Sequence, residues 1–156
     1  MAARHVLRDH NVSRPRLVIS EAKNADLKLA QALAALEKET GFPQRNIFGC
    51  DWGAGRAFCH MRVTRRRVRR LLKSDLANGV GWTQLTFPPF VRQARRMGGA
   101  HKPKFQMRVG FAHLAWLIDT YGEWGGFRRY NGSGEAAERY ATEAVDLARK
   151  WRGRLR

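Results

Sequence analysis

The chain has 156 residues, of which 44% are hydrophobic, so it is long and apolar enough for a packed core and is not a disordered polypeptide. It carries 30 Lys and Arg residues against 13 Asp and Glu residues, a formal net charge of +17. Such a surface attracts polyanions, and the charge alone does not choose between nucleic acid, an anionic membrane and an anionic cell-wall polymer.

The first 22 residues are polar and basic, and we predict that they form a basic N-terminal arm, a tail or a loosely docked segment. The stretch MAARHVLRDHNVSRPR has no apolar region of the kind found in signal peptides. A single domain is expected over residues 23–156. Its longest apolar run, around VGFAHLAWLI, is too short to span a membrane.

The helical pattern begins at Asn24, with Leu29, Leu33 and Leu36 on one apolar stripe. Gly41 and Pro43 predict that this helix ends near Glu39, which puts Glu37 and Glu39 in its last turn. Carboxylates are normally disfavoured at a helix C-terminus. At about 100° per residue Glu39 falls beside the stripe and Glu37 lies further round, so Glu39 is the acid that we expect to face the protein interior.

Residues 42–62 lack a steady period and predict a loop, either irregular throughout or with a short hairpin. Cys50 and Cys59 lie in this segment and are compatible with a reducing compartment. A bridge between them would close a small loop through DWGAGRAF, and we favour free thiols while leaving the pairing open. A zinc site built from Cys50, Cys59 and His60 would lack a second close pair of ligands, so we expect no metal.

The rest of the chain predicts four more helices. Thr64 is an N-cap for the first of them, which runs to Gly79 and is covered by six Lys and Arg residues outside its narrow apolar face. Helices are also expected over residues 90–97, over the apolar stretch 105–118 and from Ser133 onward, the stretch 105–118 being a central buried helix. The predicted fold class is therefore mainly α, with a small irregular or short β region.

The arginine-rich helix permits a second interpretation, in which the protein is a basic nucleic-acid-binding protein. The segment RRRVRR resembles a nucleic-acid or localisation patch, but helices of this design are more often simply solvated on their basic side. No recognised DNA- or RNA-binding motif accompanies it.

Three short segments point to a more specific chemistry, in this order along the chain: Glu39-Thr40-Gly41 at the end of the first helix, Gly81-Trp82-Thr83-Gln84-Leu85, and Tyr130-Asn131-Gly132. A helix that ends in Glu-Ser or Glu-Thr, followed by G-x-x-Q-[LI] and then Tyr-Asn-Ala/Gly, resembles the pattern of lytic transglycosylases and goose-type lysozymes. The segments NIFGCD and RRYNGSGEAAERYA are similar to segments of the lysozyme-like domains of phages that infect actinobacteria. The resemblance covers residues 28–155.

The resemblance implies a lysozyme-like catalytic domain over residues 23–156, with Glu39 as the general acid and base. It implies that Gln84, Tyr130 and Asn131 bind the glycan, and Trp82 is the aromatic residue that we expect in a sugar subsite. Two departures from the family pattern stand out. The interval between Glu39 and Gln84 is long and holds the arginine-rich helix, and Cys50 stands where related phage sequences often have His.

The implied reaction is cleavage of the β-1,4 bond between N-acetylmuramic acid and N-acetylglucosamine in peptidoglycan. It needs a protonated acid at the leaving oxygen and no cofactor or metal. A hydrolase also needs a second carboxylate, for which Asp51 and Glu37 are the candidates, whereas a transglycosylase uses the C6 hydroxyl of the sugar. The absence of a motif around either candidate favours the transglycosylase.

The resemblance also implies the partners. We expect a monomer that acts on bacterial peptidoglycan and is held there by anionic wall polymers, with no specific nucleic acid and no transmembrane segment. Without a signal peptide, the protein would be made in the cytoplasm of the bacterial host. It would then reach the wall as a phage endolysin after release, or as a wall-piercing component of the virion. A non-catalytic wall-binding virion protein with the same fold is a further alternative.

Overall fold

The computed structural model describes residues 2–50, 56–74 and 76–156. Helices dominate these residues, which confirms the predicted mainly α class: α1 Ala3–Asp9, α2 Pro15–Asn24, α3 Leu29–Glu39, α4 Arg65–Lys73, α5 Pro88–Met97, α6 Pro103–Asn131 and α7 Gly134–Arg154. Two short 3₁₀ helices, η1 Arg56–Phe58 and η2 Gly81–Thr83, lie between them. No helix within the described ranges combines the length and the apolar character needed to cross a bilayer.

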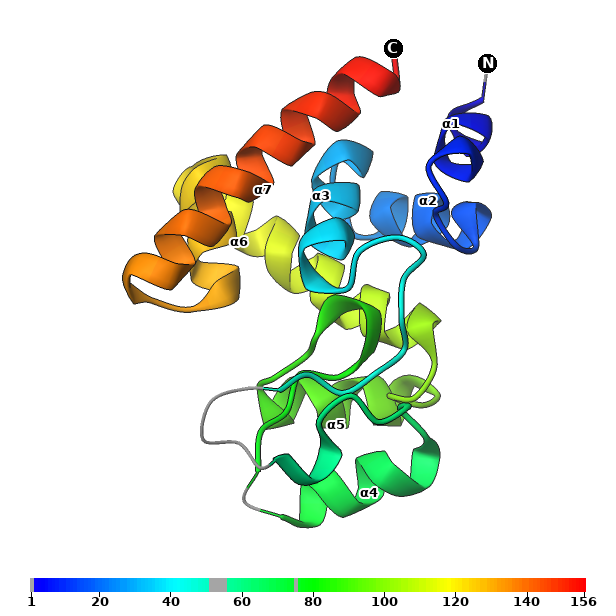
Figure 1. Cartoon of the computed structure of the whole chain (residues 1–156), viewed down its shortest axis with the longest axis vertical. Coiled ribbons are helices and arrows are strands. Elements are labelled where there is room, and N and C mark those ends of the chain that lie inside the picture. Colours follow the sequence, from blue (N-terminus) through cyan, green and yellow to red (C-terminus); the bar gives the residue numbers. More distant parts are fainter. Residues whose placement is uncertain (1, 51–55, 75) are drawn as a thin grey trace. The chain divides into compact units, whose positions relative to one another are not determined.

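The chain forms two compact units. The first unit comprises residues 1–44 and 111–156, and the second comprises residues 45–110. In the first unit α3 packs against α7, and α2 packs against α1 and α3 (Figure 1). Its core contains side chains with 0% exposure: Leu7, Val18, Leu33, Leu36, Leu114, Phe127 and Trp151. The apolar stripe predicted for the helix before Glu39 is therefore confirmed at Leu33 and Leu36.

The N-terminal segment differs from the loose arm that its polar composition predicts. Residues 3–9 and 15–24 are helical, and Leu7 and Val18 are fully buried. Pro15 stands at the first turn of α2, where a missing N–H costs no hydrogen bond. The segment is thus part of the packed first unit, while the assignment of catalysis to residues 23–156 stays a prediction.

Helix α6 is longer and less buried than the central helix predicted over residues 105–118. It runs from Pro103 to Asn131 and is interrupted at Gly122, where φ is 80° and ψ is 170°. This backbone conformation is accessible to glycine and strained for other residues. Trp116 has 58% of its surface exposed, so the helix has an open side despite its apolar composition.

The second unit holds the irregular region. Isolated antiparallel bridges pair Ile47 with Arg62 and Phe48 with Val80, and the structure contains no longer ladder within the described residues. Cys50 and Cys59 form a disulfide with their Cα atoms 4.7 Å apart, so the expectation of free thiols is wrong. Phe48 and Val80 are fully buried and belong to this unit's hydrophobic core.

Helices α4 and α5 complete the second unit. Thr64 caps α4 as predicted, because its Oγ1 accepts a hydrogen bond from the backbone N–H of Arg67 at 3.2 Å. The helix ends at Lys73 rather than near Gly79. Ser74 closes it early by donating its hydroxyl to the carbonyl of Leu71 at 2.7 Å and accepting the N–H of Leu76 at 3.2 Å.

Candidate active site

The two glutamates at the end of α3 lie in the first unit, where α3 packs against α7. The helix ends at Glu39 as predicted, with Thr40 as its C-cap and Gly41 at a φ of 75°. The N–H of Gly41 donates to the carbonyls of Leu36 and Glu37, which closes the last turn. Both glutamate side chains are half-buried.

Glu39 is held by a tyrosine of α7. The Tyr140 hydroxyl donates a hydrogen bond to Glu39 Oε1 at 2.6 Å, across 101 residues of sequence. Tyr140 is 7% exposed. Burial raises the pKa of Tyr140 well above its ordinary value, and the charges of Glu39 and Tyr130 raise it further. The phenol therefore stays protonated, as a donor to the carboxylate must.

Tyr130 also acts on Tyr140. It lies in the last turn of α6, and its charge is one of the causes that raise the pKa of Tyr140. Its ring centroid is 6.0 Å from that of His113, a half-buried histidine whose pKa is lowered by burial. Asn131, the last residue of α6, is exposed. Tyr140 thus binds Glu39 of the first sequence segment, and its pKa responds to Tyr130 of the third.

Glu37 has a different partner. Its Oε2 accepts a hydrogen bond at 3.0 Å from Nε1 of Trp151, a fully buried residue of α7. An indole N–H that is buried needs such an acceptor. Glu37 therefore has a structural role in the first unit. The two glutamates differ both in their hydrogen-bond partners and in their positions on the helix.

The glutamine of the G-x-x-Q segment lies in the second unit. Gln84 is half-buried in the left-handed region, with φ 51° and ψ 55°. Its Nε2 donates to the carbonyl of Gly81 at 2.8 Å and to that of Ile47 at 3.1 Å. These bonds hold the turn after η2 against the segment around Ile47, so the side chain has a role in the fold of the turn.

Gln106 is a buried polar residue that sequence reasoning missed. It lies on α6 with 0% exposure and makes a network with the same turn. Its Oε1 accepts the N–H of Trp82 at 2.9 Å, its Nε2 donates to Asn46 Oδ1 at 2.7 Å, and its backbone oxygen accepts the hydroxyl of Thr83 at 2.8 Å. Its Nε2 also donates to the carbonyl of Ala100 at 2.9 Å, six residues away. No local sequence signal marks Gln106, because its partners in the turn and at Asn46 are 23 to 60 residues away.

The predictions for Trp82 and Asp51 fare differently in the structure. Trp82 is 4% exposed, so its ring is not open for stacking against a sugar in this structure. Asp51, a candidate second carboxylate, lies outside the described residues. Glu39, Tyr130 and Asn131 belong to the first unit and Gln84 belongs to the second, and the expected approach of Gln84 to Glu39 stays a prediction.

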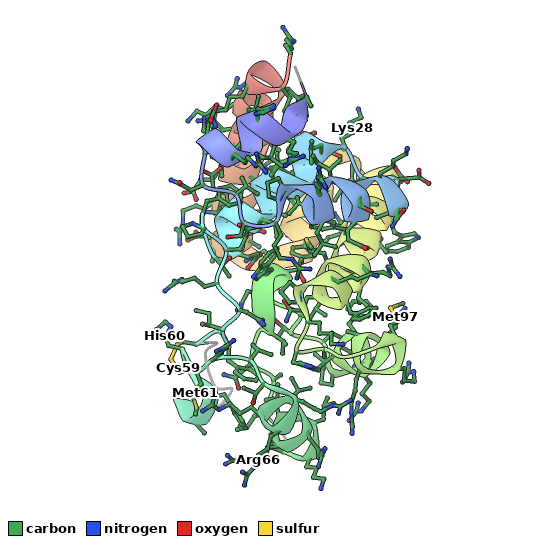
Figure 2. All side chains as sticks on the ribbon, turned by 90° about the vertical axis from the view of Figure 1, so that its right-hand side faces the viewer. Lys28, Cys59, His60, Met61, Arg66 and Met97 are labelled. Carbon is green, nitrogen blue, oxygen red and sulfur yellow. A yellow bond between two sulfur atoms is a disulfide. The ribbon has the colours of Figure 1, made fainter. Side chains whose placement is uncertain are left out.

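The two cysteines and His60 form a group in which one possible ligand atom of each residue lies within 4.8 Å of the others. Figure 2 shows Cys59 and His60 at this place in the second unit. The disulfide uses both sulfur atoms, and a metal ion is bound by thiolates rather than by a disulfide. The group therefore offers one good ligand, the imidazole of His60.

Comparisons of the chain with protein-family models, with curated proteins and with solved structures find no match. The relation to lytic transglycosylases and goose-type lysozymes thus remains a prediction from the three sequence segments.

Proposed function

We propose that the chain is a glycosidase of bacterial cell walls that cleaves the β-1,4 bond between N-acetylmuramic acid and N-acetylglucosamine, with Glu39 as its acid and base. The observation that carries the proposal is the hydrogen bond from Tyr140 to Glu39 Oε1, which fixes the carboxyl group that the sequence motif predicts to be the acid. Tyr130 of the third sequence segment acts electrostatically on the same tyrosine.

The chemistry follows from how Glu39 is held. A general acid must keep its proton aimed at the leaving oxygen, and an orientation fixed by a neighbouring hydrogen bond helps it to do so. Tyr140 holds one carboxyl oxygen, and its own high pKa keeps it a donor while Glu39 is ionised. Glu39 would protonate the departing glycosidic oxygen as the bond to the anomeric carbon breaks, and the resulting carboxylate would then act as a base.

The second step distinguishes the two forms of the reaction. In a hydrolase the carboxylate would take a proton from water, and a second carboxylate normally assists. Glu37 is already the acceptor for Trp151, which argues against it as that assistant. We therefore favour the transglycosylase form, in which Glu39 takes the proton of the C6 hydroxyl and the sugar closes to an anhydro ring.

The setting of the enzyme follows from its substrate. Bacterial walls are anionic, and the charge of +17 would hold the protein at an insoluble substrate. We propose that it acts there as a phage endolysin or as a wall-piercing component.

The test compares two glutamine variants of neighbouring residues. Glu39→Gln keeps the shape and removes the transferable proton, so we expect lysis of actinobacterial cell walls to fall by about 10²–10⁴-fold, with wall binding largely intact. Glu37→Gln keeps an oxygen that can accept the Trp151 N–H and should lyse walls at close to the normal rate. Thermal unfolding of both variants controls for folding.

The outcome that contradicts the assignment is clear. If Glu39→Gln lyses walls at a near-normal rate while Glu37→Gln abolishes lysis, the catalytic acid is Glu37 and the alignment of the motif is wrong by two residues. If both folded variants remain fully active, neither glutamate is the acid.

A further inference from the structure

The positive charge of the chain is concentrated in the second unit. Residues 45–110 contain 15 of the 30 Lys and Arg residues but only 2 of the 13 Asp and Glu residues, so this unit has a formal charge of +13. The first unit, with the other 15 cations and 11 acids, is nearly balanced by comparison. A polyanion would therefore be drawn to one part of the chain.

Within the second unit the cations line a groove between α4 and α5. A cavity of about 260 Å³ is lined by Arg65, Arg69, Arg95 and His101, together with Val68 and the turn at Gly99 and Ala100. A more open hollow of about 630 Å³ shares Arg69 and Arg95 with it. We call the two together the arginine groove, whose cations are Arg65, Arg69, Lys73, Arg92, Arg95 and Arg96.

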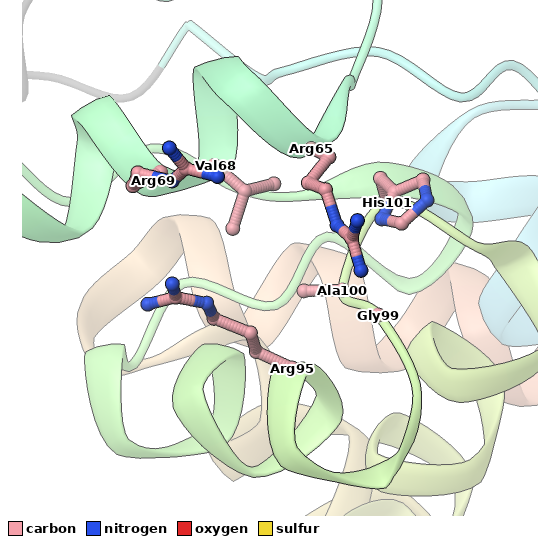
Figure 3. A pocket seen from close by; sticks show the side chains of 7 residues that line it. All are labelled: Arg65, Val68, Arg69, Arg95, Gly99, Ala100 and His101. Atoms are coloured by element: carbon pink, nitrogen blue, oxygen red, sulfur yellow. The ribbon is translucent and has the colours of Figure 1, made fainter.

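The helix geometry explains why these cations gather there. Arg65, Arg69 and Lys73 are four residues apart on α4, so they lie on one side of that helix, about 6 Å apart along its axis. Figure 3 shows Arg69 of α4 and Arg95 of α5 on opposite walls, and Arg65 reaching toward Ala100 beside His101. The groove is therefore a row of cations on one helix that faces a second set on the other.

Within the described part of the chain, no Asp or Glu carboxylate forms an ion pair with Arg65, Arg69 or Arg95 of the groove. The positive potential also acts on His101. Partial burial lowers the pKa of His101, and the charges of Lys102 and Arg65 lower it further, so its imidazole is neutral at physiological pH. An anion in the groove would relieve the repulsion among the arginines.

The shape and lining of the groove indicate the class of anion. The guanidinium group donates in a planar fork that matches phosphate oxygens. A row of cations repeating along a helix suits a linear polymer of repeated anions rather than one small ion. Apart from the imidazole of His101, no described residue lining the groove carries an aromatic ring, and single-stranded nucleic acids are usually held by aromatic stacking.

We propose that the arginine groove binds successive phosphates of a linear phosphodiester polymer that carries no bases, such as a polyol-phosphate chain of a bacterial wall. The choice of a wall polymer as the occupant rests on the proposed function, whereas the phosphate groove rests on α4 and α5 alone. Bound there, the polymer would tether the protein at the wall through residues of the second unit, whereas Glu39 belongs to the first.

The test measures binding of poly(glycerol phosphate) to the full chain and to two double variants, over a range of salt concentrations. Arg69→Ala with Arg95→Ala removes two cations from the groove. Arg66→Ala with Lys104→Ala removes two exposed cations that line neither hollow, and Arg66 projects outward from α4 (Figure 2). The two variants have the same net charge, so long-range attraction is matched between them.

We expect the groove variant to bind about tenfold or more weakly than the parent chain, because charge-assisted hydrogen bonds are lost. The slope of log affinity against log salt should fall by about two, roughly one for each lost phosphate contact. The control variant should change much less in both quantities. Equal losses in the two folded variants would overturn the groove in favour of diffuse attraction. If the alanine variant unfolds, Arg69→Lys with Arg95→Lys keeps the charges and removes the forks, so it should weaken binding with little change in the salt slope. Unchanged affinity in that folded variant would overturn the groove.

Binding of other polyanions shows which class of polymer the arginine groove selects. Duplex DNA, single-stranded DNA and polyglutamate should each bind more weakly than poly(glycerol phosphate) at the same salt concentration. Tighter binding of either DNA would overturn the wall polymer and support the nucleic-acid alternative, and equal binding of polyglutamate would overturn phosphate selectivity. None of these measurements needs glycan cleavage, so a protein that binds but does not lyse walls separates the groove from the proposed catalysis.

Discussion

At Gly81 the backbone and a side chain from another helix both require the absence of a Cβ atom. The residue has a φ of 72°, and a Cβ built on it would lie 2.0 Å from Cδ and Oε1 of Gln106. Gln106 in turn holds the N–H of Trp82. The first position of the G-x-x-Q segment is therefore explained by the fold of the turn, independently of any contact with a glycan.

Gly81→Ala should lower the free energy of unfolding by about 2–4 kcal/mol, since it adds backbone strain and displaces a fully buried glutamine. Gly153→Ala is the control, because a Cβ there meets nothing within 4 Å and the residue lies in α7. That variant should be as stable as the parent or up to about 1 kcal/mol more stable. Urea unfolding measures both, and a Gly81→Ala protein of normal stability would contradict the packing at Gln106.

Residue-level contacts were predictable only where a local rule applies. The cap at Thr64, the end of α3 at Glu39 and the buried positions Leu33 and Leu36 follow from capping preferences and helical period. The bond from Tyr140 to Glu39 does not, because periodicity indicates that Tyr140 faces inward without indicating which acceptor its hydroxyl meets. The disulfide likewise depends on the distance between the two cysteines, which the sequence does not give.

At the level of elements, Glu123 ties three helices of the first unit together. It lies on α6 directly after the break at Gly122, and its carboxylate accepts two N–H groups of Arg152 on α7 at 2.9 and 3.0 Å. Gln31 of α3 donates to it at 2.7 Å. The hydrogen bonds from Arg152 lower the pKa of Glu123 most, and the bond from Gln31 contributes in the same direction.

These hydrogen bonds of Glu123 with Arg152 and Gln31, which we call the Glu123 clamp, should make the stability of the fold depend on pH in the acid range. A carboxyl group whose pKa is lower in the folded state stabilises the fold above its unfolded pKa, here about 4.5. That contribution is lost as the pH falls through the folded pKa. The difference in unfolding free energy between the parent chain and Glu123→Gln should therefore be largest near neutral pH. It should shrink as the pH falls below about 4.5 and through the folded pKa of Glu123.

Urea unfolding at a series of pH values measures this difference. Glu135→Gln, which removes a charge from an exposed position in the first turn of α7, is the control. A gap between the parent and Glu123→Gln that stays constant across the acid range would contradict the clamp.

The elements themselves were predictable in proportion to their length and regularity. The helices around residues 90–97 and from residue 134 onward appear as α5 and α7, close to their expected positions. Helices α1 and α2 were missed because short polar helices are stabilised by packing, as at Leu7 and Val18, rather than by local propensity. The break in α6 was missed because a glycine in an apolar stretch does not reveal its backbone conformation in advance.

At the scale of the whole molecule, total charge is readable from the sequence, whereas its concentration around α4 and α5 needs the fold. If that charge tethers the protein to the wall, wall lysis should fall steeply as salt rises, because exposed charges are screened beyond about 8–10 Å at physiological ionic strength. Cleavage of small soluble chitooligosaccharides, where it is measurable, should be much less sensitive. Turbidity and product assays over one salt series make the comparison, and equal sensitivity would count against tethering.

Mass spectrometry of the fragments released from purified peptidoglycan tests the proposal that Glu39 is the catalytic acid of a wall glycosidase. We expect muropeptides cut between N-acetylmuramic acid and N-acetylglucosamine, with anhydro ends for the favoured transglycosylase form and reducing ends for a hydrolase. The same digestion with Glu39→Gln should release almost none. Release of peptide fragments alone, or glycan cleavage unchanged in Glu39→Gln, would contradict it.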